Sequence, residues 1–493
     1  MIHHHLPALQ VVLPLLAAPC CVLLHRARWA WWLTLTVSVI SFAITLGLLR
    51  QALVGGTVSY FLGGWAAPWG IEYRIDELSV FVLLVISTIN VVAIVYARAS
   101  VEQEIDSDRI YLFYTGWLLS LTGLLGMTVT ADAFNLFVFL EISSLSGYLL
   151  VSLGNDRRSL TAAFQYLVVG TIGATFILIG VGLLYMMTGT LNMIDLAARL
   201  PQVMHTRTVL VALAFLVVGI GIKLALFPLH LWLPNAYTYA PSAVTVFLAG
   251  TATKVGVYVL YRFIFGVFGV QFSFGAVHLQ HVFLTLAILG ILGGSIVALY
   301  QTNAKRILAY SSIAQVGYMV AGIGLASITG LTSSILHLFN HALMKAALFM
   351  ALGAMFYRLN SVMLDDLEGI AQRMPWTMAA FVAAGLSLIG VPLTVGFVSK
   401  WYLILAALER GWWWLAGVVL VSSLLALVYI WRIAEVAYFK PLSQTGPAVT
   451  EAPMGLLAPM WALIVLNFYF GIDASFTTTV ASRAAAMLLG SGI

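Results

Sequence analysis

The sequence predicts an all-α, polytopic membrane protein with about fourteen transmembrane helices. Its 493 residues are 62% hydrophobic and only 8% charged, and its mean hydropathy is +1.02. Soluble proteins have about a quarter of their residues charged, so a soluble fold is excluded. Apolar runs of about 20 residues, the length that crosses a bilayer as a helix, recur along the whole chain. Strands of an outer-membrane barrel would instead alternate apolar and polar residues in segments of about ten.

Apolar runs between charged or Gly/Pro-rich breaks give the approximate spans of these helices. In chain order they are 6–24, 29–49, 78–97, 110–130, 133–153, 162–187, 208–230, 241–261, 280–300, 307–326, 330–357, 377–408, 412–431 and 455–472. The 377–408 run is too long for one straight span, and the 208–230 run is interrupted near its end. We expect both of these segments to be broken helices.

The basic residues in the loops predict the orientation of the chain, because cytoplasmic loops carry the excess of Lys and Arg. One set of alternating loops holds twelve of them: Arg26, Arg28, Arg98, Arg109, Arg157, Arg158, Lys305, Arg306, Arg358, Arg373, Arg432 and Lys440. The opposite set holds seven: Arg50, Arg74, Arg199, Arg207, Arg262, Arg410 and Arg483. We therefore expect both termini to lie outside the cell.

The remaining basic residues are four lysines inside apolar segments: Lys223, Lys254, Lys345 and Lys400. Among the acidic residues, only Glu141 lies well inside a span. A charge at the bilayer centre costs at least about 2.5–3.5 kcal/mol on insertion scales, so these residues require a polar interior. Buried lysine releases a proton readily, whereas arginine stays protonated. The set is therefore predicted to carry protons. In the alternative interpretation, some lysines lie near span ends and extend to the interface.

Glu141 has apolar residues on its N-terminal side and small hydroxyl residues on its C-terminal side. Ser143, Ser144 and Ser146 permit close approach of a second helix and can form hydrogen bonds to it. A neighbouring ammonium group would stabilise the ionised carboxylate against burial. The alternative is a structural carboxylate that joins two helices, which does not exclude a proton role.

Lys223 and Lys400 each lie within a few residues of an expected helix break. Pro228 and Pro234 follow Lys223, and Pro392 precedes Lys400. Proline removes a backbone hydrogen bond, and non-helical backbone persists at membrane depth only inside protein or beside water. Interrupted helices at corresponding places in two halves of a transporter indicate an ion site. Simple proline kinks are the alternative.

His337, His341 and Lys345 are spaced at i, i+4 and i+8, which places them along one helical face. Histidine titrates near neutrality and can relay a proton between lysines. Two histidines four residues apart could also bind a metal, but Lys345 would repel a cation and the sequence offers no suitable third ligand. Helix packing through Asn340 and the histidines is the other alternative.

These residues resemble the antiporter-like family shared by Mrp-type multisubunit sodium/proton antiporters, respiratory complex I and membrane-bound hydrogenases. The resemblance covers about residues 70–440 and is specific because several motifs occur together. The runs that carry it are Asp132–Tyr148, Lys223–Pro241, Lys305–Tyr318, His337–Lys345 and Gly390–Lys400.

The resemblance implies fourteen helices with two inverted five-helix repeats, each containing one interrupted helix. It divides the chain into an N-terminal three-helix segment (1–109), a first repeat of spans four to eight (110–265), a second repeat of spans nine to thirteen (280–440), and a C-terminal helix with a tail (455–493). It also implies a proton path, in which Glu141 is the charge-switching glutamate and Lys223 its partner. The other implied members are the connecting Lys254, the central relay of His337, His341 and Lys345, and the outlet Lys400.

Within this family, the length of the chain fits the D-type chains of Mrp antiporters or a similarly sized complex I or hydrogenase subunit. The Glu141–Ser144 and Ala236–Pro241 runs look closest to the Mrp D type. The implied function is ion translocation in a multisubunit Na⁺/H⁺ antiporter of a prokaryotic inner membrane. Its expected partners are other membrane subunits, protons, sodium and the lipid bilayer, and no nucleic acid. The alternatives are a proton-pumping subunit of a redox complex of the complex I or hydrogenase type, and a purely structural subunit.

The sequence contains no quinone-site signature and no flavin, iron–sulfur or nucleotide motif. We therefore expect no cofactor and no enzymatic activity of the chain on its own. It would form part of a translocating oxidoreductase only under the redox alternative.

Overall fold

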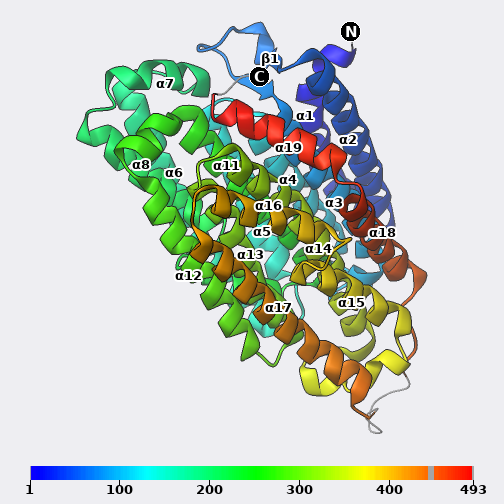
Figure 1. Cartoon of the computed structure of the whole chain (residues 1–493). Coiled ribbons are helices and arrows are strands. Elements are labelled where there is room, and N and C mark those ends of the chain that lie inside the picture. The colour runs from blue at the N-terminus through cyan, green and yellow to red at the C-terminus, as the bar shows by residue number, and fades with distance from the viewer. Residues whose placement is uncertain (1, 442–448, 491–493) are drawn as a thin grey trace.

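A computed structural model describes residues 2–441 and 449–490 of the chain. These residues form a bundle of long helices with both chain ends at the same end of the bundle (Figure 1). We call this the terminal end, and the other one the opposite end. Two termini on one side agree with an even number of spans.

The α-helices are α1 (Leu6–Leu24), α2 (Ala27–Gly55), α3 (Glu77–Glu104), α4 (Ile110–Val129), α5 (Ala133–Ser152), α6 (Arg157–Thr188), α7 (Met193–Arg199), α8 (Arg207–Lys223), α9 (Trp232–Tyr239), α10 (Ser242–Gly250), α11 (Ala252–Tyr261), α12 (Leu279–Leu299), α13 (Ala304–Gly324), α14 (Ile328–Leu359), α15 (Pro375–Ile389), α16 (Val395–Glu409), α17 (Trp413–Phe439), α18 (Met454–Ile472) and α19 (Ser475–Leu488). Two π-helical turns, η4 (Arg262–Val267) and η5 (Gln271–Ala276), follow α11. Short 3-10 turns are η1 (Ile2–His5), η2 (Leu62–Gly64), η3 (Leu200–Gln202), η6 (Leu364–Leu367) and η7 (Ile370–Gln372).

The predicted fold class is confirmed, because twelve helices among the described residues are long and apolar enough to cross a membrane. They coincide with twelve of the fourteen predicted spans. The other two are the segments predicted to be interrupted. The first breaks after α8 and resumes at α9, and the second breaks between α15 and α16. The inverted relation of the two five-helix repeats stays a prediction.

Several elements were not predicted from the sequence. An antiparallel hairpin of β1 (Val58–Phe61) and β2 (Glu72–Ile75) lies between α2 and α3. The C-terminal tail forms α19, which lies across the terminal end of the bundle (Figure 1). It is too short and too polar for a span, but its alanine-rich face is buried. The last residues of the predicted tail, 491–493, lie outside the described residues.

The eighth span also contains a break that the sequence did not predict. Thr251 separates α10 from α11 with a backbone outside the helical region, at φ −126° and ψ −56°. Its hydroxyl donates to the Phe247 carbonyl at 2.6 Å. Such a bond from a threonine to the carbonyl four residues earlier bends helices, and neither proline nor glycine is needed for it.

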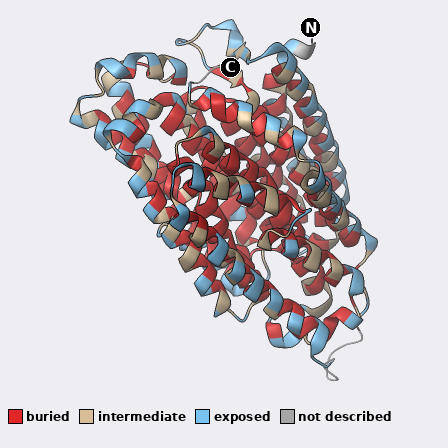
Figure 2. Cartoon of the chain, viewed as in Figure 1, coloured by how far each residue is buried: buried red, intermediate tan, exposed pale blue. Residues whose placement is uncertain are grey.

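The centre of the bundle is α14, in which residues 330–355 are all buried. It packs against α3, α10, α13, α15, α16, α18 and α19. Figure 2 shows the buried residues gathered in the middle of the bundle and the exposed ones along its outer helices. A helix enclosed on every side presents its polar face to protein, so the His337–Lys345 face is not exposed to lipid.

The close contact between α4 and α5 gives a test of this packing. A Cβ atom on Gly123 would lie 2.5 Å from the Phe139 carbonyl oxygen and 2.5 Å from the Ser143 nitrogen. Gly123→Ala should therefore force the two helices apart and destabilise the protein by about 1–3 kcal/mol, the usual cost of overpacking. The melting temperature of the purified protein measures this. Gly182→Ala is the matched control, because a Cβ there meets nothing within 4 Å. Equal melting temperatures for the two variants would contradict the packing.

Candidate functional site

Lys223 and Glu141 meet where the first interrupted helix stops. Lys223 is the last residue of α8, and its Nζ lies 4.0 Å from Glu141 Oε1 on α5. The same Nζ donates to Ser144 Oγ at 2.7 Å and to Tyr148 Oη at 3.3 Å. The ammonium thus has neutral oxygens as close partners and the carboxylate as a more distant one. If Glu141 moves away, the Lys223 ammonium therefore keeps its hydrogen bonds to Ser144 and Tyr148.

Glu141 differs from the other predicted site residues in its exposure. Its side chain is 24% exposed on the outer surface of the chain, compared with 10% for Lys223. Its Oε1 atom has no hydrogen-bond partner among the described residues. A carboxylate on a surface at membrane depth is costly in contact with lipid. The exposed part of the Glu141 side chain therefore needs water or another protein chain beside it.

A small cavity adjoins Lys223 on its inner side. Its volume is about 30 Å³, and Lys223, Ser143, Ser144, Ala252 and Gly256 are among its lining residues. A cavity needs about 10–15 Å³ of this measure to hold one water molecule. It can therefore hold water between Lys223 and α11, the helix that carries Lys254.

Lys254 lies one turn beyond the break at Thr251 and is completely buried. Its Nζ donates to the carbonyl of Ala249, in the last turn of α10, and to Thr253 Oγ1 at 3.4 Å. The last four carbonyls of a helix lack partners within it, and a cation is favoured at that end. The break in the eighth span thus creates the polar environment that Lys254 occupies.

The three residues on the α14 face lie side by side and fully buried. The rings of His337 and His341 are nearly parallel, with centroids 5.8 Å apart. His337 contacts Ser399 Oγ through Nδ1 and Gln315 Oε1 through Nε2, both at 2.9 Å. Neither ring nitrogen of His341 has a hydrogen-bond partner among the described residues.

Lys345 completes this face one turn further along α14. Its Nζ donates to the Leu308 carbonyl at 2.7 Å and to Ser311 Oγ, both on α13. Lys254 is close enough to His341 and to Lys345 for a Coulombic interaction with each. The unpartnered His341 ring therefore lies near both lysines. Because buried polar groups are nearly always hydrogen-bonded, we expect ordered water at this ring.

Lys400 lies at the second interrupted helix, and its surroundings resemble those of Lys254. Its Nζ donates to the carbonyls of Leu388 and Ile389 at 3.0 and 2.9 Å, where α15 ends, and to Ser423 Oγ at 3.0 Å. The Nζ also lies 5.1 Å from the centre of the Tyr318 ring. That ring in turn lies 5.5 Å from His337. Lys400 is thereby linked to the α14 face.

The structure thus places the predicted site residues inside the helix bundle in two groups. Glu141 and Lys223 form the first group, at the outer surface. The second group contains Lys254, His337, His341, Lys345 and Lys400, which are at most 5% exposed. The amines of Lys254 and Lys345 donate to internal groups, so neither side chain extends to the interface as in the alternative interpretation.

A charged residue that the sequence placed in a loop forms a half-buried ion pair. Arg262 was assigned to a loop, but it lies in η4 at the end of a candidate span. Its guanidinium binds Asp76 through two bonds of 2.6 and 2.7 Å. Burial raises the pKa of Asp76, and the charge and hydrogen bonds of Arg262 more than offset this, so the pKa lies below its usual value. Asp76 also caps α3 through the Ser79 nitrogen, a pattern visible in the sequence.

Several known membrane proteins are similar to this chain over most of its length. Residues 130–426 match the family model described as NADH:quinone oxidoreductase/Mrp antiporter, transmembrane. The chain is 45% identical to the N-type chain of NADH-quinone oxidoreductase from Desulforudis audaxviator, over 91% of this chain and 89% of that protein. It is 32% identical to the D-type chain of the Na⁺/H⁺ antiporter from Alkalihalophilus pseudofirmus, over 87% of this chain and 86% of that protein.

Similar solved structures come from multisubunit membrane complexes. A chain of the Mrp complex from Dietzia sp. superposes with a TM-score of 0.91 at 28% identity, covering 100% of this chain and 98% of that one. A chain of the archaeal membrane-bound sulfane sulfur reductase superposes with a TM-score of 0.89 at 31% identity, covering 98% and 97%. The structural similarity extends over the whole length of both chains.

Proposed function

Since this chain belongs to the NADH:quinone oxidoreductase/Mrp antiporter family of transmembrane proteins, we propose that it is the ion-translocating subunit of a multisubunit Na⁺/H⁺ antiporter. The observation that carries this proposal is the buried row of titratable side chains between two interrupted helices. On this proposal the chain is a transporter subunit and not an enzyme. The residues that carry protons are Glu141, Lys223, Lys254, His337, His341, Lys345 and Lys400.

The pair at the first interrupted helix acts as the charge switch. An ionised Glu141 stabilises the ammonium of Lys223 across 4.0 Å. If Glu141 is neutralised or turns away, Lys223 keeps only neutral oxygens as partners and releases its proton more readily. The proton then moves inward through the adjoining cavity toward Lys254. The separation and the partial exposure of Glu141 permit such a change.

The remaining residues connect this switch to the second interrupted helix. Lys254 and Lys345 flank His341, and His337 stacks on His341 and lies near Tyr318 and Lys400. Lys400 exchanges protons with one side of the membrane. In this arrangement each group passes a proton to the next one along the row, through water where no side chain bridges the gap.

The two repeats are proposed to be residues 110–265 and 280–440, inverted with respect to each other. The positions of the breaks support this division, because each interrupted helix is the fourth span of its repeat. Residues 1–109 and 455–493 would flank the repeats. We further propose a prokaryotic inner membrane, with the terminal end outside.

A second candidate function is favoured by a specific observation. The relative at 45% identity is named as the N-type chain of an NADH-quinone oxidoreductase. The chain would then be a proton-pumping subunit of a redox complex, and the same buried row would be driven by electron transfer in other subunits. The D-type relatives and the Mrp complex neighbour support the antiporter instead.

The proteins that assemble with this chain discriminate between the two functions. Purification of the chain from its native membrane, followed by identification of the subunits that copurify with it, tests the proposal. We expect membrane subunits only. Copurification of iron–sulfur or flavin subunits in fixed stoichiometry would contradict the antiporter and support the redox complex.

A further inference from the structure

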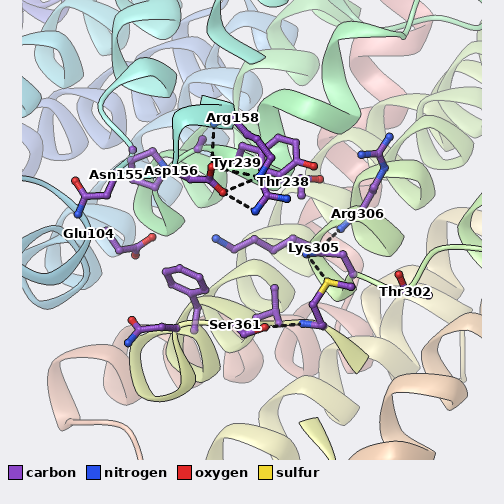
Figure 3. A pocket seen from close by; sticks show the side chains of 18 of the residues that line it. Glu104, Asn155, Asp156, Arg158, Thr238, Tyr239, Thr302, Lys305, Arg306 and Ser361 are labelled. Atoms are coloured by element: carbon purple, nitrogen blue, oxygen red, sulfur yellow. Dashed lines mark hydrogen bonds and ion pairs between the residues drawn. The ribbon is translucent and has the colours of Figure 1, made fainter. Parts of the chain in front are cut away.

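A wide cavity opens at the opposite end of the bundle, away from the chain termini. Its volume is about 580 Å³, and its walls come from loops and helix ends of both halves of the chain. Figure 3 shows Lys305 extending across it toward Glu104, with Asp156 and Arg158 on the adjacent wall. Polar side chains predominate among its labelled lining residues. The cavity is therefore suited to hold water and ions, and we call it the vestibule.

Two opposite charges are buried in the vestibule wall and joined through one serine. Glu104 and Lys305 are 8% and 3% exposed. Glu104 Oε2 accepts from the Ser242 nitrogen at 2.8 Å and from Ser242 Oγ at 3.0 Å, and its Oε1 accepts from Ser100 Oγ at 2.6 Å. Lys305 Nζ donates to Ser242 Oγ at 3.0 Å. The serine hydroxyl, which has one hydrogen, donates it to Glu104 and accepts from Lys305.

This arrangement continues inward along α13 to the buried row. Lys305 lies in the first turn of α13, and Leu308 is three residues further on, which corresponds to about 4.5 Å along the axis at 1.5 Å per residue. The Leu308 carbonyl accepts from Lys345 Nζ and from Ser311 Oγ. The backbone of Lys305 therefore lies about one helical turn from the Leu308 carbonyl that accepts from Lys345.

We propose that Glu104, Ser242 and Lys305 form a proton inlet that connects the vestibule to Lys345, an inference that rests on the proposed function. A proton on Lys305 passes to Ser242 Oγ while the serine's own proton passes to Glu104. This leaves a neutral amine, an intact hydroxyl and a neutral acid. The reverse transfer restores the ammonium and the carboxylate. Lys305 thereby alternates between exchange with the vestibule, through Glu104, and exchange with Lys345, through water near Ser311.

A purely structural role predicts different properties for these residues. A charge pair that only joins α3 to α13 needs one positive and one negative group of fixed charge. Lys305→Arg keeps the positive charge but does not release a proton. Glu104→Gln keeps the shape and still accepts from Ser242, but it cannot bind a proton as a carboxylate does. These two conservative variants thus separate proton transfer from assembly.

The test uses the complete complex in proteoliposomes with a pH-sensitive dye inside. Proton flux is measured under an imposed pH gradient, with sodium or with choline as the external cation. We expect Lys305→Arg and Glu104→Gln to lower the flux about a hundredfold, at the lower end of what a positioned proton-transfer group contributes. Arg306→Met is the matched control, because Arg306 lines the same vestibule but has no place in the inlet. Copurifying subunits and melting temperature report assembly for each variant.

The outcomes separate the inlet from the proposed function. Proton flux by both conservative variants near the wild-type rate, with a sodium-dependent wild type, would overturn the inlet alone. A wild-type complex that moves no protons with either cation would overturn the proposed function and the inlet with it. Loss of flux in both variants but not in Arg306→Met supports the inlet, whether or not the wild-type flux depends on sodium.

Discussion

Glu141→Ala is expected to abolish proton transport by the complex while the complex still assembles. The carboxylate is the negative partner of Lys223, at 4.0 Å, and without it the charge switch cannot operate. We expect the rate to fall by at least about a hundredfold, the scale of a lost proton-transfer group. Lys223→Ala should have an equal effect, because the two side chains act as one unit. The measurement is sodium-driven proton flux in membrane vesicles.

Two further variants test whether the loss of transport depends on the charge and the position of Glu141. Glu141→Asp should retain part of the activity, since the charge remains while its reach shortens by one methylene group. Glu409→Ala removes an exposed carboxylate at the end of α16 and serves as the control. Normal transport by a well-assembled Glu141→Ala complex would refute the assignment of Glu141 to the path.

Lys400→Arg is expected to block transport although it keeps the positive charge. Lys400 donates to two carbonyls at the end of α15 and to Ser423, and an arginine can satisfy the same oxygens. Arginine stays protonated in proteins, so it cannot pass a proton on. If Lys400 only anchors the interrupted helix, the arginine variant should work nearly as well as the wild type. Proton flux, again compared at equal assembly, decides between these outcomes.

The control for Lys400→Arg is the same substitution at a surface lysine. Lys440 forms an exposed ion pair of 2.9 Å with Glu368, and Lys440→Arg should leave transport unchanged. Close packing at Lys400 makes the assembly check necessary, because a Cβ on Gly390 would lie only 3.0 Å from Lys400 Cδ. Transport by assembled Lys400→Arg at the wild-type rate would reject a proton-carrying role.

Much of the fold could be predicted from the sequence because a helix that crosses the bilayer needs about 20 consecutive apolar residues. Uninterrupted apolar runs correspond to the twelve long helices, and Pro228, Pro234 and Pro392 indicated the two interrupted ones. The break at Thr251 could not be predicted, since threonine and glycine within a mostly apolar run also occur in continuous helices. The helical tail after residue 472 was missed because its buried face consists mainly of alanine.

The site residues that could be predicted are those whose charged side chain lies within an otherwise apolar run. Lys305 was not recognised as a site residue because it follows the polar residues Thr302 and Asn303. A helix that starts with polar residues resembles a loop in sequence, so Lys305 was assigned to a loop. Glu104 was missed for the corresponding reason at a helix end. Partial exposure of Glu141 could not be inferred either, because the polar residues of α5 do not lie on one face and so do not indicate which side of the helix is exposed.

On the proposed function, one continuous path joins Lys223 to Lys400 through the middle of the chain. An experimental density map of the assembled complex, at a resolution that shows ordered water, tests it most directly. We predict water molecules in the cavity beside Lys223 and at both ring nitrogens of His341, linking Lys254 to Lys345. A dry apolar layer between Lys223 and Lys254, or between Lys254 and Lys345, would contradict the claim and would require separate half-channels.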